Sequence, residues 1–289
     1  MISYPWGVDG TTVRVLEEGS GDRVALLVHG VGARADRWRC NLGALAIAGF
    51  HAYAIDLPGH GFSDKGDFDY SVGGYASLAL SFLDSIDAGR CVLIGTSLGG
   101  HVQAAVTCRQ PSRVTALIMV GSLGITPLGE QHRAAVAASL ADTSASGIAA
   151  KLARVVHDSS LITAEWVQGE SRINSSPGAA GAFAALARYF RDGIDGDVVG
   201  DRLAGLAAPP PTLLIWGEQD QIVPLAVGKA AQRLLGADVP LVTIPVAGHA
   251  PYLERPAEFN DAVLSFLRRA GLAGQPPGVD PPTLEEGRS

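Results

Sequence analysis

Short apolar runs recur along the chain and predict buried strands. They are bounded by Gly, Asp or Pro and are rich in β-branched residues, as expected of strands that are buried on both faces. The runs are VALLV at 24–28, HAYAID at 51–56, CVLIG at 91–95, TALIMVG at 115–121, TLLIWG at 212–217 and PLVTIP at 240–245. Helix-like stretches at 72–86 and 98–109 lie between several of them. This alternation predicts a mostly parallel α/β sheet with helices on both faces.

The beginning of the chain departs from this rhythm. Residues 11–28, TTVRVLEEGSGDRVALLV, read as two strands joined by a turn at Gly19–Asp22. Two strands joined in this way predict an antiparallel hairpin, which we expect at the edge of the sheet.

The rhythm stops again after Ile125. Residues 126–207 contain Ala-rich helical segments at 131–140 and 181–190 but no convincing strand, and the prolines at 209–211 then return the chain to a strand. We therefore predict one α/β core, residues 1–125 and 208–270, interrupted by a helical cap at 126–207. The Pro/Gly-rich residues 271–289 are expected to form a flexible tail.

Composition supports a single large folded unit with a small-molecule partner. Hydrophobic residues make up 47% of the 289 residues and charged residues 18%, which excludes a disordered or collagen-like chain. The formal net charge is −7 and there is no basic tract, so neither nucleic acid nor an anionic membrane is an expected partner.

The cysteines and the N-terminus predict a cytoplasmic protein. Cys40, Cys91 and Cys108 are odd in number and form no CxxC pair, which disfavours a disulfide framework or a zinc site. MISYPWGVDG lacks the features of a signal peptide, and no apolar run approaches the roughly 18 residues that span a bilayer.

The strongest chemical signal is the pentapeptide Gly95-Thr96-Ser97-Leu98-Gly99, between an apolar run and a helix-like stretch. A G-x-S-x-G pattern in this context is a nucleophile elbow, in which a tight turn projects the serine hydroxyl above the sheet. The competing interpretation is an ordinary Gly-rich turn, and the strand–turn–helix context favours the nucleophile.

A nucleophilic serine needs a base and an acid, since its hydroxyl is weak at neutral pH. His249 follows the run at 240–245 and Asp220 follows the run at 212–217, so both lie at carboxyl ends of predicted strands, on the same edge as Ser97. Glu218 is the close rival of Asp220, and we interpret it as a solvated turn acid. The other histidines have packing or surface interpretations; they are His29, His51, His60, His101, His132 and His157.

Acyl transfer also needs N–H donors for the oxyanion. We expect one from Leu98, at the start of a helix, and the other from Val31, with Gly32 as the alternative. Gly30 and Gly32 beside Val31 let the backbone approach a substrate without a Cβ in the way.

With these motifs in place, the chain resembles the α/β-hydrolase family over nearly all of residues 24–266. The matching motifs are His29-Gly30-Val31-Gly32, the loop Asp56 to Ser63, the elbow, Trp216 to Asp220 and Gly248-His249. The resemblance implies an α/β-hydrolase fold, with a mostly parallel eight-stranded sheet and a helical cap inserted after the sixth strand. In that family Asp56 and His60 belong to a structural loop. Ser97 separates the chain from the haloalkane dehalogenases and epoxide hydrolases, whose nucleophile is aspartate.

Within that family the chain most resembles the meta-cleavage-product hydrolases, which split carbon–carbon bonds in vinylogous diketones. The cap stretches 156–163 and 167–169 are similar to theirs. The chain differs where their substrate-binding arginine would fall, because Glu170 stands there and Arg172 is two positions further on. Ala250 replaces their tryptophan after the catalytic histidine, and Thr96 precedes the serine where Asn is frequent.

Because of these departures, a serine hydrolase of small to medium hydrophobic carboxylic esters ranks first. Carbon–carbon bond hydrolysis ranks second, and a non-catalytic ligand receptor on the same fold is the alternative from another class. No metal or organic cofactor is expected, and the oligomeric state stays open. We expect a mainly apolar pocket under the cap, with apolar cap residues available to line it; these are Leu140, Ile148, Leu152, Trp166 and Phe183. The expected substrate-binding residues are Gly30, Gly32, Thr96, Trp166, Arg172 and Ala250.

Overall fold

The chain forms one eight-stranded sheet that is mostly parallel, as predicted. In the computed structural model, which describes residues 1–274, the strand order is β1-β2-β4-β3-β5-β6-β7-β8. The strands are β1 (Ile2–Val8), β2 (Thr11–Glu18), β3 (Arg23–Val28), β4 (Phe50–Ile55), β5 (Cys91–Thr96), β6 (Val114–Val120), β7 (Thr212–Gly217) and β8 (Leu241–Ile244). β2 is antiparallel to both β1 and β4, whereas the pairs from β4 to β8 are all parallel.

The hairpin predicted for residues 11–28 is wrong. β2 and β3 are consecutive but not neighbours, because β2 pairs with β1 and β4, and β3 pairs with β4 and β5. The edge hairpin is instead β1–β2, turning at Asp9 and Gly10, which both have positive φ. The turn at Gly19–Asp22 carries the chain past the position that β4 fills.

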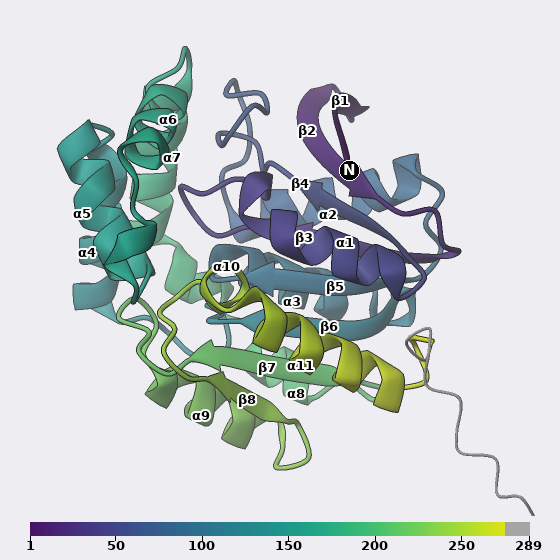
Figure 1. The fold of residues 1–289 in the computed structure, drawn as a ribbon. Helices are drawn as coiled ribbons and strands as arrows, with labels where there is room; N and C mark the ends of the chain where they lie inside the picture. Colours follow the sequence, from purple (N-terminus) through teal and green to yellow (C-terminus); the bar gives the residue numbers. More distant parts are fainter. Residues whose placement is uncertain (275–289) are drawn as a thin grey trace, which may run out of the picture.

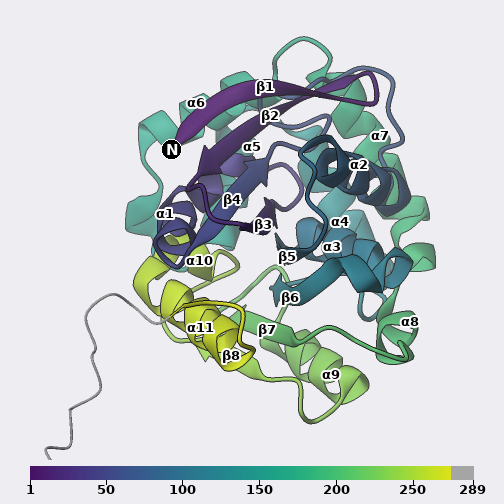
Figure 2. The same cartoon turned by 90° about the vertical axis from the view of Figure 1, so that its right-hand side faces the viewer.

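Helices cover both faces of the sheet (Figure 2). Along β3 the faces alternate: Leu26 packs in the hydrophobic cluster that includes residues of α2 and α3, and Leu27 in the cluster that includes residues of α1 and α11. The helices of the two layers are α1 (Arg39–Ile47), α2 (Val72–Ser85), α3 (Leu98–Arg109), α9 (Leu225–Leu235), α10 (Pro251–Glu254) and α11 (Pro256–Arg269). The predicted helix at 98–109 has these same bounds.

Five helices and no strand lie between β6 and β7, in agreement with the strand-free segment of the sequence. They are α4 (Glu130–Ala141), α5 (Ala145–Val155), α6 (Ala164–Asn174), α7 (Ala179–Asp192) and α8 (Gly200–Ala204). Figure 1 shows α4 to α7 beyond the end toward which the arrows of β5 and β7 point, whereas α8 packs against α3 and α9. Short 3-10 turns complete the described chain: η1 (Ala35–Trp38), η2 (Pro111–Arg113), η3 (Ser159–Leu161) and η4 (Ile194–Asp197).

The strand order creates a crevice at the carboxyl ends of β3 and β5. The chain leaves β3 toward β4 on one side and returns to β5 on the other, so the loops after these adjacent strands diverge. Ligands of open α/β sheets bind at such switch points. The loop 29–34 and the turn at Ser97 therefore lie on opposite sides of one opening.

None of the helices within residues 1–274 is both long and apolar enough to cross a membrane.

Candidate active site

Ser97 lies at a sharp turn between β5 and α3, where its backbone adopts φ 54° and ψ −119°. Positive φ strains a non-glycine residue by roughly 1–3 kcal/mol and persists only where the surroundings enforce it. Both flanks require glycine, because a Cβ on Gly95 would lie 2.3 Å from the Gly99 carbonyl oxygen and one on Gly99 would lie 2.3 Å from that of Val28. The Ser97 amide donates to the Val120 carbonyl at 3.0 Å. The strained turn is therefore held by its own glycines and by β6.

His249 and Asp220 meet at the same edge of the sheet. The Nδ1 atom of His249 and the Oδ2 atom of Asp220 are 2.8 Å apart, so the ring N–H donates to the carboxylate. The other carboxylate oxygen accepts from the amides of Ile222 and Val223 at 2.8 Å each, which fixes its orientation. Glu218 is exposed, in agreement with its interpretation as a solvated acid. The Asp220 carboxylate can therefore hold the His249 ring in one tautomer.

The loop that carries His249 is joined to the carboxyl end of α5. The His249 amide donates to the Val155 carbonyl at 2.7 Å. A Cβ on Gly248 would lie 2.7 Å from that same oxygen, so this close approach requires glycine. Glu254 bridges the two segments: its Oε1 accepts from the Gly248 amide at 2.7 Å and its Oε2 from the His157 amide at 2.6 Å. The position of His249 thus depends on α5 as well as on β8.

The loop after β3 lies against Ser97. A Cβ on Gly30 would lie 3.0 Å from the Ser97 Cβ, and Gly32 has φ +66°. Within residues 1–274 the amide of Val31 donates to no protein atom, and that of Leu98 is the first of α3, where helix amides have no intrahelical partner. Both amides are therefore available to an external acceptor.

His29 holds this loop from the core. Its Nδ1 donates to the Gly30 carbonyl at 2.7 Å, and its Nε2 accepts from the Leu57 amide at 2.9 Å. Burial lowers the pKa of His29, which outweighs the opposite effect of Asp56. Asp56 accepts from the Ala35 amide at 2.6 Å, so His29 and Asp56 both support this loop from the core.

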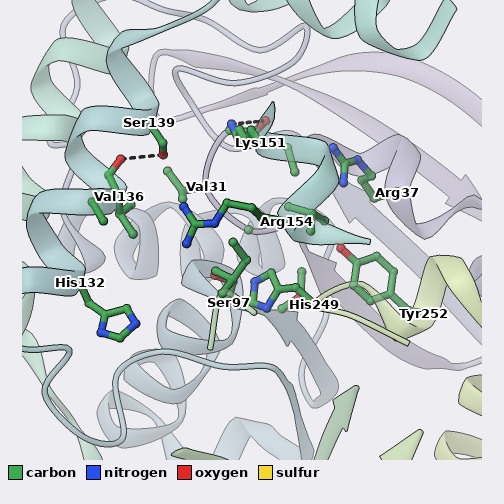
Figure 3. Close-up of a pocket in the computed structure, with 17 residues that line it drawn as sticks. Val31, Arg37, Ser97, His132, Val136, Ser139, Lys151, Arg154, His249 and Tyr252 are labelled. Carbon is green, nitrogen blue, oxygen red and sulfur yellow. Dashed lines mark hydrogen bonds between the residues drawn. The ribbon is translucent and has the colours of Figure 1, made fainter. Parts of the chain in front are cut away.

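A cavity of about 90 Å³ lies in front of Ser97. Figure 3 shows Ser97 and His249 side by side at its base. The lining residues are Gly30, Val31, Gly32, Ala33, Arg37, Thr96, Ser97, His132, Ala135, Val136, Ser139, Lys151, Arg154, Val155, Ile222, His249 and Tyr252. Gly30, Gly32 and Thr96, which the sequence analysis expects to bind substrate, are among them, and their role in binding stays a prediction.

Three other expected substrate-binding residues do not reach this cavity. Trp166 lines a neighbouring cavity together with Glu170. Arg172 lies on the exposed side of α6, and Ala250 is fully buried in the core layer of α11. The other apolar residues that were expected to line the pocket pack in the protein interior instead. They are Leu140, Ile148, Leu152 and Phe183, and all four are buried.

Sequence reasoning missed the cations of the pocket, which are Arg37, Lys151 and Arg154. Lys151 and Arg154 are three positions apart in α5, a spacing that places side chains on one face of a helix. That spacing was the available signal, but which element the face meets is a tertiary property. Within residues 1–274 no group of three or more His, Cys, Asp or Glu side chains could hold a metal ion.

Several known proteins are similar to this chain over most of its length. Residues 25–262 match the model described as the alpha/beta hydrolase family. A 2-hydroxy-6-oxononadienedioate/2-hydroxy-6-oxononatrienedioate hydrolase of Burkholderia vietnamiensis is 30% identical, and the match covers 90% of this chain and 93% of the relative. The dihydrolipoyllysine-residue acetyltransferase component of the acetoin cleaving system of Pseudomonas putida is 30% identical, covering 91% of this chain and 68% of the relative. The crystal structure of a membrane phospholipase A superimposes with a TM-score of 0.80 and 27% identity, covering 93% and 86%.

Proposed function

The chain belongs to the alpha/beta hydrolase family, and on that premise we propose that it is a serine hydrolase that cleaves carboxylic esters through an acyl-enzyme. One observation carries the proposal. Ser97 and His249 line the same cavity, and Asp220 lies 2.8 Å from the opposite side of the His249 ring. This arrangement supports Ser97 as nucleophile, His249 as base and Asp220 as the acid that orients the base.

In the proposed first step, His249 Nε2 takes the proton of the Ser97 hydroxyl while Oγ attacks the ester carbonyl carbon. Asp220 stabilises the imidazolium that forms. The amides of Val31 and Leu98 donate to the oxygen that becomes negative, in the role of an oxyanion hole. The tetrahedral intermediate then collapses, the ester C–O bond breaks, and the imidazolium returns its proton to the leaving alcohol.

In the second step, His249 removes a proton from a water molecule, which attacks the acyl carbon. The same two amides hold the second oxyanion. Collapse of this intermediate breaks the bond to Ser97 Oγ, which recovers its proton from His249, and the carboxylic acid leaves. The strained Ser97 backbone keeps Oγ at the cavity through both steps.

The size of the cavity favours a small acyl group. With a volume of about 90 Å³, the space in front of Ser97 suits a chain of a few carbon atoms. We propose that residues 126–207 act as a cap over this space and that residues 1–125 and 208–270 form the core. The last predicted segment, the tail at 271–289, lies mostly outside the described residues. The three cysteines are free, which supports a reducing compartment such as the cytoplasm.

Replacement of Ser97 tests the proposal. We expect Ser97→Ala to reduce hydrolysis of 4-nitrophenyl acetate and butyrate by about a thousandfold or more, because members of such a triad act as a unit. Ser77→Ala, which removes an exposed hydroxyl on α2, is the matched control and should leave the rate unchanged. Activity that survives in Ser97→Ala with an unchanged melting temperature would contradict the proposed mechanism.

Carbon–carbon bond hydrolysis is the second candidate. The Burkholderia relative is named as a hydrolase of dienedioates, and it matches 90% of this chain at 30% identity. Incubation with a yellow dienoate ring-fission product tests this activity, because cleavage bleaches the colour. Bleaching that Ser97→Ala abolishes, together with no ester hydrolysis, would replace the first candidate by the second.

A further inference from the structure

The charge of the cavity is one-sided. Arg37, Lys151 and Arg154 line it, and none of its described lining residues is acidic. The rest of the wall is mainly apolar, as expected from the sequence, but the three cations were not expected. Burial of a charge without a counter-ion is costly, which applies to Arg37 and to the partly buried Lys151, whereas Arg154 is exposed to solvent.

The protein itself neutralises Arg37. Its Nη2 atom is 3.3 Å from Glu170 Oε1, and Arg34 Nη1 is 3.0 Å from the same oxygen. The Arg37 guanidinium also lies 4.8 Å from the centre of the Trp166 ring. Burial alone would raise the pKa of Glu170, but Arg37 and Arg34 outweigh it and hold the pKa below its ordinary value. Glu170 is therefore an ionised partner of two arginines.

Within residues 1–274, Lys151 and Arg154 form no ion pair, although Glu170 favours the charged form of Lys151 from a longer distance. Lys151 Nζ donates only to the neutral Gly32 carbonyl, at the long distance of 3.4 Å. Arg154 forms no hydrogen bond or ion pair with the part of the chain that the structure describes, and Figure 3 shows its side chain reaching into the cavity toward Ser97. Two cations without an ion-pair partner among the described residues thus lie beside the proposed nucleophile.

The position of these two side chains suits recognition of a short acyl group. Both project from one face of α5, and Lys151 lies against Gly32, next to the proposed oxyanion donor Val31. An acyl chain bound to Ser97 would extend from there into a cavity of only about 90 Å³. A guanidinium and an ammonium on its wall match the geometry and charge of a carboxylate.

We infer that Lys151 and Arg154 form an anion subsite, and that the preferred substrate is a monoester of a short dicarboxylic acid. The free carboxylate binds the two cations while the ester carbonyl faces Ser97. This inference rests on the proposed esterase function and adds the substrate class to it.

The test compares two ethyl esters that differ in charge. Monoethyl glutarate carries a terminal carboxylate, and ethyl pentanoate has a methyl group in its place. We expect kcat/KM of the wild-type protein, measured by acid release, to be higher for the glutarate by between about tenfold and a hundredfold, as for a hydrogen-bonded charge pair. In the Ser97→Ala protein, calorimetry should show binding of monoethyl glutarate and much weaker binding of ethyl pentanoate.

Arg154→Gln should remove most of this preference, chiefly by raising KM for the glutarate, so that the ratio of the two kcat/KM values falls toward one. Lys151→Met should also lower the ratio of the two kcat/KM values. A disturbance of the adjoining loop with Val31 would slow both esters alike, so it would not change this ratio. Arg188→Gln is the matched control, since Arg188 is an exposed arginine on α7 outside the cavity.

The outcomes separate this inference from the proposed function. Ser97-dependent hydrolysis of ethyl pentanoate at least as fast as that of the glutarate overturns the inference and keeps the esterase. So does a preference that Arg154→Gln leaves intact, or one that Arg172→Gln removes instead. Binding of the glutarate to Ser97→Ala that depends on Arg154, without hydrolysis of any ester by the wild type, supports the subsite and overturns the esterase.

Discussion

Burial destabilises the charged form of Lys151, and the surrounding residues offset this effect only in part. Burial lowers its pKa to about 8, Glu170 opposes this effect, and Arg37 adds to it. Because the neutral form prevails above that pKa, the ammonium is present below about pH 8 and is lost as the pH rises further. The anion subsite therefore loses one of its two cations in a range where arginine stays charged.

This titration predicts a pH-dependent preference. Between about pH 7.5 and 9 the ratio of kcat/KM for monoethyl glutarate to that for ethyl pentanoate should fall by roughly threefold to tenfold. The charged groups that act on Lys151 are Glu170 and Arg37; the pKa of Glu170 is held below its ordinary value, and arginine is not deprotonated in proteins, so neither charge changes over this range. A rate profile of both esters measures the ratio. Lys151→Arg should keep the ratio flat, and a flat ratio in the wild type would refute the role of Lys151.

Single residues differ in how far the sequence could assign them. Ser97, Asp220 and His249 were accessible because each follows an apolar run, and such ends meet at one edge of a parallel sheet. Lys151 and Arg154 were not, because their direction depends on where α5 packs. Arg172 was the cation nearest to the expected position in the sequence, yet the helix turns it to solvent.

Among the elements, α5 has the most varied contacts with the site. It supplies Lys151 and Arg154 to the cavity, and its last residue, Val155, accepts the hydrogen bond of the His249 amide. Glu254, at the end of α10, fastens the chain after α5 to Gly248 through hydrogen bonds from both segments. Glu254 is therefore a positioning residue for His249.

Removal of this link should impair catalysis without changing substrate preference. For Glu254→Ala we expect kcat for both ethyl esters to fall between about tenfold and a hundredfold, since small misplacements of a catalytic group have effects of this size. The ratio of kcat/KM for the glutarate to that for the pentanoate should stay at the wild-type value. A general loss of the fold or of the anion subsite would change this ratio. Glu258→Ala on α11 removes an exposed carboxylate and serves as the control. Wild-type kcat in Glu254→Ala would disprove the positioning role.

The positions of the strands and helices along the chain were predicted better than the pairing of the strands in the sheet. The central strands could be read from continuously apolar runs bounded by turn residues, and the helices at 72–86 and 98–109 from the stretches between those runs. The strands that pair with β2 could not be predicted in this way. A turn such as Gly19–Asp22 shows that two strands are consecutive in sequence, but it does not show whether another strand lies between them in the sheet. β4, which fills that place, follows a whole helix later.

For the whole molecule, the sign of the net charge is opposite to that of the cavity. The chain carries a formal −7, whereas the cavity is lined by cations. The net negative charge of the protein thus repels an anionic substrate, and the cations of the cavity attract it once it is within a few ångströms of them. The local attraction acts within one Debye length, about 10 Å at 0.1 M ionic strength, and it decides the binding step.

Salt should therefore act on one ester and not on the other. Raising NaCl from about 20 mM to about 300 mM should lower kcat/KM for monoethyl glutarate by roughly twofold to fivefold and leave ethyl pentanoate nearly unchanged. Arg154→Gln should weaken the dependence for the glutarate. Equal salt effects on both esters would show that the cavity charge plays no part in binding.

The architecture as a whole was predictable, because alternating apolar runs and helices allow few sheet topologies and the motifs fall at consistent places in them. The chemistry of the cavity was not. It arises where a helix from the inserted segment meets loops from both halves of the core, and no local pattern encodes that encounter.

The union of recognition and catalysis on α5 also bears on how such an enzyme can change. Lys151, Arg154 and Val155 lie within five consecutive positions, so a change that displaces the end of α5 moves both the two cations and the carbonyl that accepts from the His249 amide. In directed evolution, specificity gained by displacing this helix will come with slower turnover until a compensating change appears on the 248–254 loop. Selectivity and turnover are coupled through the end of α5. We therefore expect improved variants to combine a substitution on α5 with one on the 248–254 loop.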